Sequence, residues 1–184
     1  ENRLRSTIAG EKALEKAFKR DQVWETYDYV LIDCPPNIGR LSIAAMVAVD
    51  EILVPVDARS PSLEAMTHLL GWISQDPNGE EIFNQGTYDT VREDLNADLG
   101  LCGILVCRCN ERKRQERAVL DELRNDPRLG AFVFRTVIRE NVDLSEAHGN
   151  REPITVYNPS SRGAEDYRAL AAEVIAQEDE DGQG

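Results

Sequence analysis

The hydrophobic positions along the chain form short runs separated by charged segments, and four of these runs predict buried strands. Each run is almost continuously apolar, which is typical of strands covered on both faces in a parallel sheet. The predicted strands are residues 29–33 (YVLID), 51–57 (EILVPVD), 101–107 (LCGILVC) and 131–138 (AFVFRTVI). Pro55 limits the hydrogen bonding of the second strand because proline has no N–H group.

Amphipathic spacing and capping residues predict helices between these strands. Leu63, Met66 and Leu70 mark one helix that is opened by Ser60 and Pro61, since serine caps a helix and proline suits its first position. Asn141 is a similar cap, and either Ser160 or Ser161 opens the last helix. The predicted helices are residues 3–20 (with an interruption at Gly10 left open), 41–49, 60–75, 113–126, 141–148 and 160–176.

Alternating strands and helices predict an α/β fold, a doubly wound and mainly parallel sheet with helices on both faces. We expect a single domain over residues 1–176. Residues 76–100 are polar and rich in turn formers, so they predict a long connection or an insertion, with a short helix near 90–99. Residues 177–184 predict an acidic disordered tail.

The composition is that of a globular protein in the cytoplasm. The 184 residues include 41% hydrophobic ones, which suffices for a sizeable core. No apolar run reaches the roughly 18 residues that span a bilayer, and the first residues are too charged for a signal peptide. The four cysteines lie in strand-like contexts and predict reduced thiols.

The charge balance adds a hypothesis about the source. The net charge is −13, and Lys12, Lys16, Lys19 and Lys113 are the only lysines. An acidic, lysine-poor surface suits a halophilic cytoplasm, where molar salt shortens the screening length to about 3 Å and removes self-repulsion. An ordinary acidic protein is the alternative. The acidic excess also disfavours a broad nucleic-acid footprint.

Residues 27–57, YDYVLIDCPPNIGRLSIAAMVAVDEILVPVD, strongly resemble the Walker B and switch region of the ParA/MinD family of partition ATPases. That region has an apolar strand, an aspartate, a small residue, two prolines and a glycine a few residues later. Two further blocks are similar to the family in the same order, GILVCRCNERKRQERAVLDELR at 103–124 and the closing segment 133–174. The resemblance covers about residues 27–176, and it implies the P-loop NTPase-like fold.

The resemblance implies an Mg²⁺–ATP site around Asp33. A carboxylate at a strand end can hold the waters of octahedral Mg²⁺, which bridges the β- and γ-phosphates, so Asp33 is the catalytic and metal-binding candidate. Cys34, Pro35, Pro36 and Gly39 would form the switch loop. On the residues alone, Asp33 could equally cap a turn, and the loop could be a rigid connection.

The resemblance also places nucleotide-base contacts at two later loops. Asn110 and Arg112 follow the third strand, although solvated loop residues would look the same. Residues 138–142 read IRENV where the family has Ile-Pro-Arg-Asn-Val, so Arg139 stands in the place of the proline. Arg139, whose plane can stack on adenine, and Asn141 are the candidates there.

Asp143 stands where the family has an arginine of its nonspecific DNA surface, which leaves DNA binding in doubt. Arginines of 112–124 could form a basic face, but acidic residues alternate with them, which favours a salt-bridged solvent face.

No glycine of this chain is followed by lysine, so it contains no Gly-Lys-Ser/Thr phosphate loop. We interpret the chain as the C-terminal portion of such a protein, truncated or recorded only from that point. Taken alone it should not hydrolyse ATP efficiently, so whether it is an enzyme stays open. Loss of the family's first strand should leave neighbouring strand edges unpaired.

The function implied by the resemblance is a nucleotide-dependent dimer switch in chromosome or plasmid partitioning or cargo positioning. Its ligands would be ATP and Mg²⁺, and its partners a second copy of the chain and a ParB-like protein, with no membrane. The alternative is a noncatalytic binding or scaffold module that keeps the fold without the phosphate loop.

Overall fold

The computed structural model describes residues 10–35, 37–59, 62–75, 80–110 and 112–181. The chain forms two compact units, residues 1–52 with 65–101 and residues 53–64 with 102–184. Each unit has an apolar cluster of its own. The single domain that the sequence predicts over 1–176 stays a prediction.

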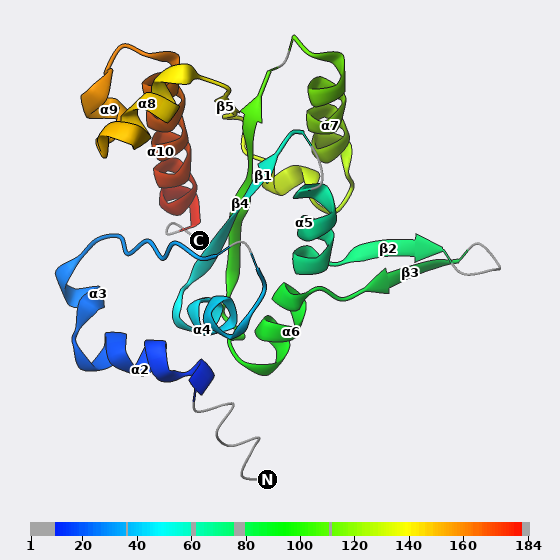
Figure 1. The fold of residues 1–184 in the computed structure, drawn as a ribbon. Helices are drawn as coiled ribbons and strands as arrows, with labels where there is room; N and C mark the ends of the chain where they lie inside the picture. The colour runs from blue at the N-terminus through cyan, green and yellow to red at the C-terminus, as the bar shows by residue number, and fades with distance from the viewer. Residues whose placement is uncertain (1–9, 36, 60–61, 76–79, 111, 182–184) are drawn as a thin grey trace. The chain divides into compact units, whose positions relative to one another are not determined.

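A three-stranded sheet organises the second unit, in the order β1 (Glu51–Asp57), β4 (Gly100–Cys109) and β5 (Ile138–Arg139). β4 pairs with β5 in parallel, and β1 and β4 run in the same direction (Figure 1). Ile104 and Val106 of the central strand are fully buried. The strands predicted at 51–57 and 101–107 are therefore confirmed.

The strand predicted at 131–138 is largely wrong. A 3₁₀ turn, η1 (Gly130–Phe132), begins this segment, Val133 makes an isolated bridge to Ile104, and β5 has only two residues. The reason lies in the hydrogen bonding, because the backbone N–H groups of Arg135 and Thr136 donate to a helix carboxylate instead of to a neighbouring strand.

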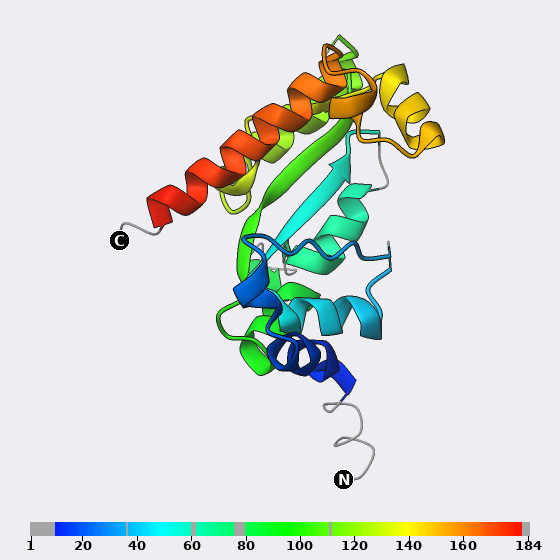
Figure 2. The same ribbon diagram turned by 90° about the vertical axis from the view of Figure 1, so that its left-hand side faces the viewer.

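Helices flank the sheet of the second unit on both faces. α10 (Arg162–Asp181) covers one face and α7 (Arg114–Asn125) lies on the other (Figures 1 and 2). Leu170 and Val174 of α10 pack against the core residue Phe134, together with Leu105 and Ile138. The α/β fold with a helix-flanked parallel sheet is thus confirmed.

Helix caps predicted from the sequence are present in this unit. The Asn141 side chain accepts the N–H of Asp143 at 2.9 Å and opens α8 (Val142–Asn150). Ser161 Oγ accepts the N–H of Ala164 at 3.1 Å at the start of α10. The short helix α9 (Ile154–Tyr157) was not predicted.

The acidic tail needs correction. α10 continues to Asp181, so residues 177–181 are helical and not disordered, while 182–184 lie outside the described residues. Glutamate and glutamine are good helix formers, which lets the helix extend past its apolar face.

The first unit packs helices α2 (Ala13–Arg20), α3 (Val23–Thr26), α4 (Arg40–Ala48) and α6 (Thr87–Asp94). Met46 and Val47 of α4 pack against Val91 of α6 and Leu99. The side-chain amide of Asn96 donates to the carbonyls of Met46 and Val49, both at 3.0 Å, and so closes the end of α4. The helices predicted at 3–20 and 41–49 are confirmed over α2 and α4, and residues 3–9 of the first lie outside the described residues.

Two predictions in the first unit are wrong. α5 (Ser62–Leu70) ends five residues earlier than predicted, because Gly71 adopts a φ of +77°. An antiparallel hairpin of β2 (Trp72–Gln75) and β3 (Glu81–Asn84) follows where a helix end and a polar connection were expected. The predicted cap residues 60 and 61 lie outside the described residues.

The strand predicted at 29–33 does not form. The side chains of Tyr27, Tyr29 and Leu31 are exposed, Leu31 by 93%. A strand buried on both faces needs partners along both edges, and among the described residues no strand pairs with this segment.

Gly103 of β4 should be intolerant of a side chain. A Cβ atom there would lie 2.6 Å from Phe134 Cε2 and 2.9 Å from the Phe132 carbonyl oxygen. We expect Gly103→Ala to lower the free energy of unfolding by about 1–3 kcal/mol through overpacking. Chemical denaturation measures this, with Gly149→Ala as the control because nothing lies within 4 Å of its Cβ position. Equal stability of the two variants would contradict the packing described for β4.

Candidate functional site

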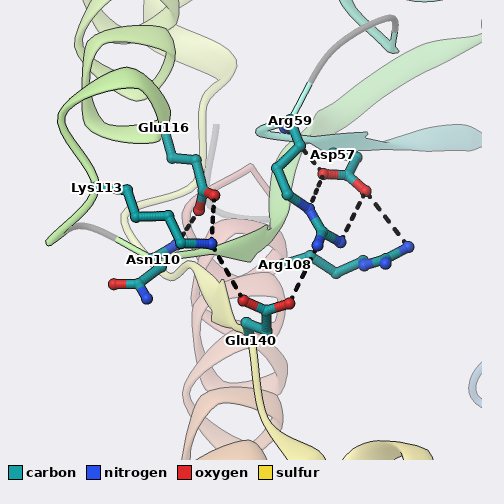
Figure 3. A network of polar contacts seen from close by, with 7 residues as sticks. All are labelled: Asp57, Arg59, Arg108, Asn110, Lys113, Glu116 and Glu140. Carbon is teal, nitrogen blue, oxygen red and sulfur yellow. Dashed lines mark hydrogen bonds and ion pairs between the residues drawn. The ribbon is translucent and has the colours of Figure 1, made fainter.

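A network of ion pairs lies at the carboxyl ends of the strands in the second unit (Figure 3). Asp57, the last residue of β1, accepts the backbone N–H of Arg59 at 2.9 Å and its Nε at 3.3 Å. Arg108 Nη1 lies 3.5 Å from the same carboxylate. Burial by itself would raise the pKa of Asp57, but these hydrogen bonds and the two guanidinium charges outweigh it and lower the pKa.

Glu140 joins this aspartate to the loop after β4. Its carboxylate lies 3.1 Å from Arg59 Nη1 and 3.5 Å from Lys113 Nζ. Lys113 Nζ in turn lies 3.0 Å from Glu116. Positive and negative groups therefore alternate through the network, and each charge neutralises its neighbours (Figure 3).

Glu116 fixes the backbone of the predicted base-binding loop. It is buried on α7 and accepts the N–H of Asn110 at 2.6 Å. That hydrogen bond, with the one from Lys113, lowers the pKa of Glu116. The Asn110 side-chain oxygen accepts the N–H of Arg112 at 3.2 Å, and the amide group points away from the ion pairs (Figure 3). The Arg112 side chain is exposed.

Arg139 of β5 is held by α10. Asp166 accepts its backbone N–H at 2.9 Å, its Nε at 2.9 Å and its Nη2 at 2.5 Å. Glu165 lies 3.3 Å from Nη2. The Arg139 side chain is 38% exposed whereas that of Asp166 is 8% exposed. The hydrogen bonds that Arg139 donates to Asp166 raise the pKa of the guanidinium group, which is charged at every physiological pH.

Asn141 serves as the N-cap of α8, and its side-chain oxygen is already bonded to the Asp143 N–H. Any role that Asn141 has toward a base must therefore use its remaining amide donors or its backbone.

Asp33 and the predicted switch loop lie in the first unit. Asp33, Cys34 and Pro35 are exposed and irregular, and Pro36 lies outside the described residues. Gly39 directly precedes α4 as its N-cap residue. Desolvation and the Asp33 charge raise the pKa of the Cys34 thiol, so this thiol stays protonated near neutral pH.

The predicted site residues thus divide between the two units. Asn110 and Arg139 lie close together, since Cys109 pairs with Arg139 across β4 and β5, and Asp33 belongs to the other unit. The prediction did not include Asp57 or Asp166. Asp57 had a signal, because like Asp33 it closes an apolar strand, whereas Asp166 had none, since it lies beside the predicted apolar positions of the last helix.

The described residues contain no helix long and apolar enough to cross a membrane. In the same part of the chain, no group of three His, Cys, Asp or Glu side chains could hold a metal ion.

Solved structures define the fold class. The cell-division ATPase MinD from Pyrococcus furiosus superposes with a TM-score of 0.63 at 19% identity, over 91% of this chain and 59% of that one. Cobyrinic acid a,c-diamide synthase from Mycobacterium smegmatis superposes with a TM-score of 0.61 at 22% identity, over 88% of this chain and 51% of that one. The fold is that of the P-loop NTPases.

Curated proteins with similar sequences are mostly named as partitioning proteins. The sporulation initiation inhibitor protein Soj of Bacillus subtilis is 37% identical over 92% of this chain and 60% of that protein. The chromosome-partitioning ATPase Soj of Thermus thermophilus is 38% identical over 83% of this chain and 54% of that protein. The chromosome partitioning protein ParA of Myxococcus xanthus is 34% identical over 81% of this chain and 47% of that protein. A family model described as an AAA domain matches residues 1–78. The chain is thus similar to Soj and ParA partitioning proteins over most of its own length, and it spans about half the length of the curated relatives that it matches.

The buried carboxylate of Glu116 predicts an acid-sensitive contribution to stability. Its pKa in the folded state lies below the unfolded value of 4.5, so the stabilisation is complete above that pH and is lost as the pH falls through the folded pKa. We expect Glu116→Gln to lower the melting temperature at pH 7 and to flatten its decline between about pH 5 and pH 3.

Thermal melts across this pH range measure the effect, and Glu122→Gln, an exposed position of the same helix, is the control. A parallel pH dependence of the wild type and Glu116→Gln would exclude the role assigned to this carboxylate.

Proposed function

We propose that the chain is part of a ParA-like ATPase that works as a nucleotide-dependent dimer switch in chromosome or plasmid partitioning or in cargo positioning. One observation carries the proposal. The Asp33-Cys-Pro-Pro segment, with Gly39 after it, lies in a chain that is 37% identical to Soj over 92% of its length.

Asp33 has the chemistry of an outer ligand for Mg²⁺. Its carboxylate is exposed, and no ion pair or hydrogen bond of the described residues involves it, so its oxygens can accept from metal-bound water. When bound with ATP, Mg²⁺ would neutralise charge on the β- and γ-phosphates. The MinD of Pyrococcus horikoshii, which shares this fold with a TM-score of 0.60, was solved with Mg-ADP.

The remaining candidates keep their proposed roles. Cys34, Pro35, Pro36 and Gly39 form the loop that responds to the γ-phosphate, because prolines at one end and glycine at the other allow discrete backbone positions. The base contacts are assigned to a set of loop residues of the second unit: Asn110, Arg112, Arg139 and Asn141.

The partners follow from the same family. We expect a second copy of the chain to dock when ATP is bound, a ParB-like protein to stimulate hydrolysis, and the protein to act in the cytoplasm. Nonspecific DNA binding is disfavoured, because Asp143 replaces a basic residue and Arg117 is paired with Asp121 at 3.8 Å.

The second candidate function is a noncatalytic scaffold. It is favoured by one feature of the sequence, since none of the glycines in these 184 residues is followed by lysine. The codons upstream of Glu1 discriminate between the two, because a glycine-rich loop with a lysine there favours the switch and a start codon next to Glu1 favours the scaffold.

A halophilic source predicts a salt requirement. With a net charge of −13, the acidic side chains repel one another in dilute buffer, and molar salt screens this repulsion. We therefore expect the melting temperature to be higher in molar KCl than in low salt. Thermal melts in the two buffers measure it, and equal stability would favour an ordinary acidic protein.

Asp33→Ala tests the switch directly. In the complete gene product we expect the substitution to reduce Mg²⁺-dependent ATP hydrolysis by about 10²-fold or more, because it removes the carboxylate that holds the metal-bound water. The assay is phosphate release in high KCl with and without Mg²⁺.

Asp28→Ala is the matched control, because Asp28 is an exposed aspartate of the same segment. We expect this variant to hydrolyse ATP like the wild type. Undiminished hydrolysis by Asp33→Ala would refute the metal role. If the wild type releases no phosphate and does not bind ATP, the scaffold is favoured instead.

A further inference from the structure

Helix α10 presents two carboxylates to the backbone of the segment that leads into β5. Glu173 accepts the N–H groups of Arg135 at 2.7 Å and of Thr136 at 2.9 Å. Asp166 accepts the N–H of Arg139 at 2.9 Å. Three backbone donors of residues 135–139 are therefore satisfied by side chains of one helix.

The spacing of the two carboxylates matches the spacing of the donors. Asp166 and Glu173 are seven residues apart, which is about two helical turns and a rise of about 10.5 Å. The donors at 136 and 139 are three residues apart, which in extended chain spans about 10 Å. The helix therefore runs along this segment, so that both carboxylates reach its backbone donors.

This arrangement solves a problem of the sheet edge. β5 ends the strand order β1-β4-β5, so its outer edge has no strand partner among the described residues. Unpaired edge N–H groups need other acceptors when they are partly buried. Burial by itself would raise the pKa of Glu173, but the hydrogen bonds from Thr136 and Arg135 outweigh it and lower the pKa, so this acceptor is ionised at neutral pH.

Asp166 has a second function that Glu173 lacks, because it also holds a guanidinium group. It binds Nε and Nη2 of Arg139, which are donors along one edge of the planar group. An edge-on contact fixes the orientation of the plane without itself covering either face. With 38% of the Arg139 side chain exposed, a flat ligand can reach it.

The presence of an arginine at position 139, and not a residue without an N–H group such as proline, explains why both contacts occur together. A proline at position 139 would have no N–H group and a fixed φ, so it would need no acceptor. Arginine introduces a backbone donor and loses that rigidity. The buried carboxylate of Asp166 satisfies the donor and restores the rigidity through the side chain.

We propose that Asp166 is a positioning residue that holds the Arg139 guanidinium as a stacking platform for the purine base of the bound nucleotide. This inference rests on the function proposed above. Asp166 does not touch the nucleotide, and it acts by fixing the plane and the backbone of residue 139. Stacking of a base on an arginine plane contributes to affinity for the base and not to affinity for the phosphates.

The test compares two ligands of the complete gene product, Mg²⁺-ATP and Mg²⁺-tripolyphosphate, which has no base. We expect Asp166→Asn to weaken ATP binding about tenfold. The asparagine side chain has no negative charge, and its NH₂ group would face the N–H donors of Arg139 where a carboxylate oxygen accepted them. Tripolyphosphate binding should stay within about twofold, since the variant leaves the phosphate contacts in place. Isothermal titration at several temperatures below the melting point measures both.

Two further variants keep the test decisive. Glu165→Gln removes the exposed neighbour that touches the same guanidinium at 3.3 Å, and it should bind both ligands like the wild type. Arg139→Lys keeps the charge but loses the plane, and it should reproduce the selective loss of ATP binding even if Asp166→Asn folds poorly.

The outcomes separate this inference from the function on which it rests. A wild-type protein that binds tripolyphosphate and ATP equally well, or an Asp166→Asn or Arg139→Lys variant that loses both ligands in parallel, would overturn the stacking platform alone. A wild-type protein that binds neither ligand would overturn the proposed nucleotide switch, and the role of Asp166 with it. Selective loss of ATP in both variants supports the inference.

Discussion

The position of the second unit's long helix depends on one requirement, that backbone N–H groups at the edge of a sheet find acceptors. Asp166 and Glu173 meet it for residues 135–139. Because they do so from one helix, α10 must run along residues 135–139, and this brings Leu170 and Val174 onto the apolar cluster. Polar satisfaction and apolar burial thus select the same placement, which is the agreement between levels that a stable fold needs.

The same use of carboxylates recurs along the chain. Glu116 accepts the N–H of Asn110, Asp57 that of Arg59, and Asp126 those of Arg128 and Leu129. Charge-assisted hydrogen bonds of this kind are stronger than those between neutral groups, and they vanish when the carboxyl group is protonated. Part of the acidic composition therefore has a structural reason that does not depend on the salt content of the cell, whichever explanation holds for the net charge.

Local patterns predicted the elements whose stability is largely local. The run at 101–107 forms β4, and Asn141 and Ser161 cap helices. These features were predictable because hydrophobic periodicity and capping residues are recognised within a few neighbouring positions of the sequence. The run at 29–33 has an equally apolar pattern but forms no strand, since a strand also needs partners that no local pattern supplies. The hairpin β2–β3 begins after Gly71, which ends α5 by adopting a positive φ. A single glycine in the sequence does not by itself predict such a change of direction. Asp166 had no signal, because its partner lies 27 residues earlier in the chain.

Two aspartates close apolar runs in this sequence, and the structure distinguishes their chemistry. The oxygens of Asp57 are committed to Arg59 and Arg108, and its lowered pKa reflects those partners. A metal ion there would have to displace two guanidinium groups. The oxygens of Asp33 are exposed and, within the described residues, outside every ion pair. A hard cation such as Mg²⁺, which retains most of its water, needs oxygen acceptors that are exposed and not engaged in ion pairs, as those of Asp33 are. The apolar run before each aspartate does not separate the two, whereas the local charges agree with the metal role proposed for Asp33.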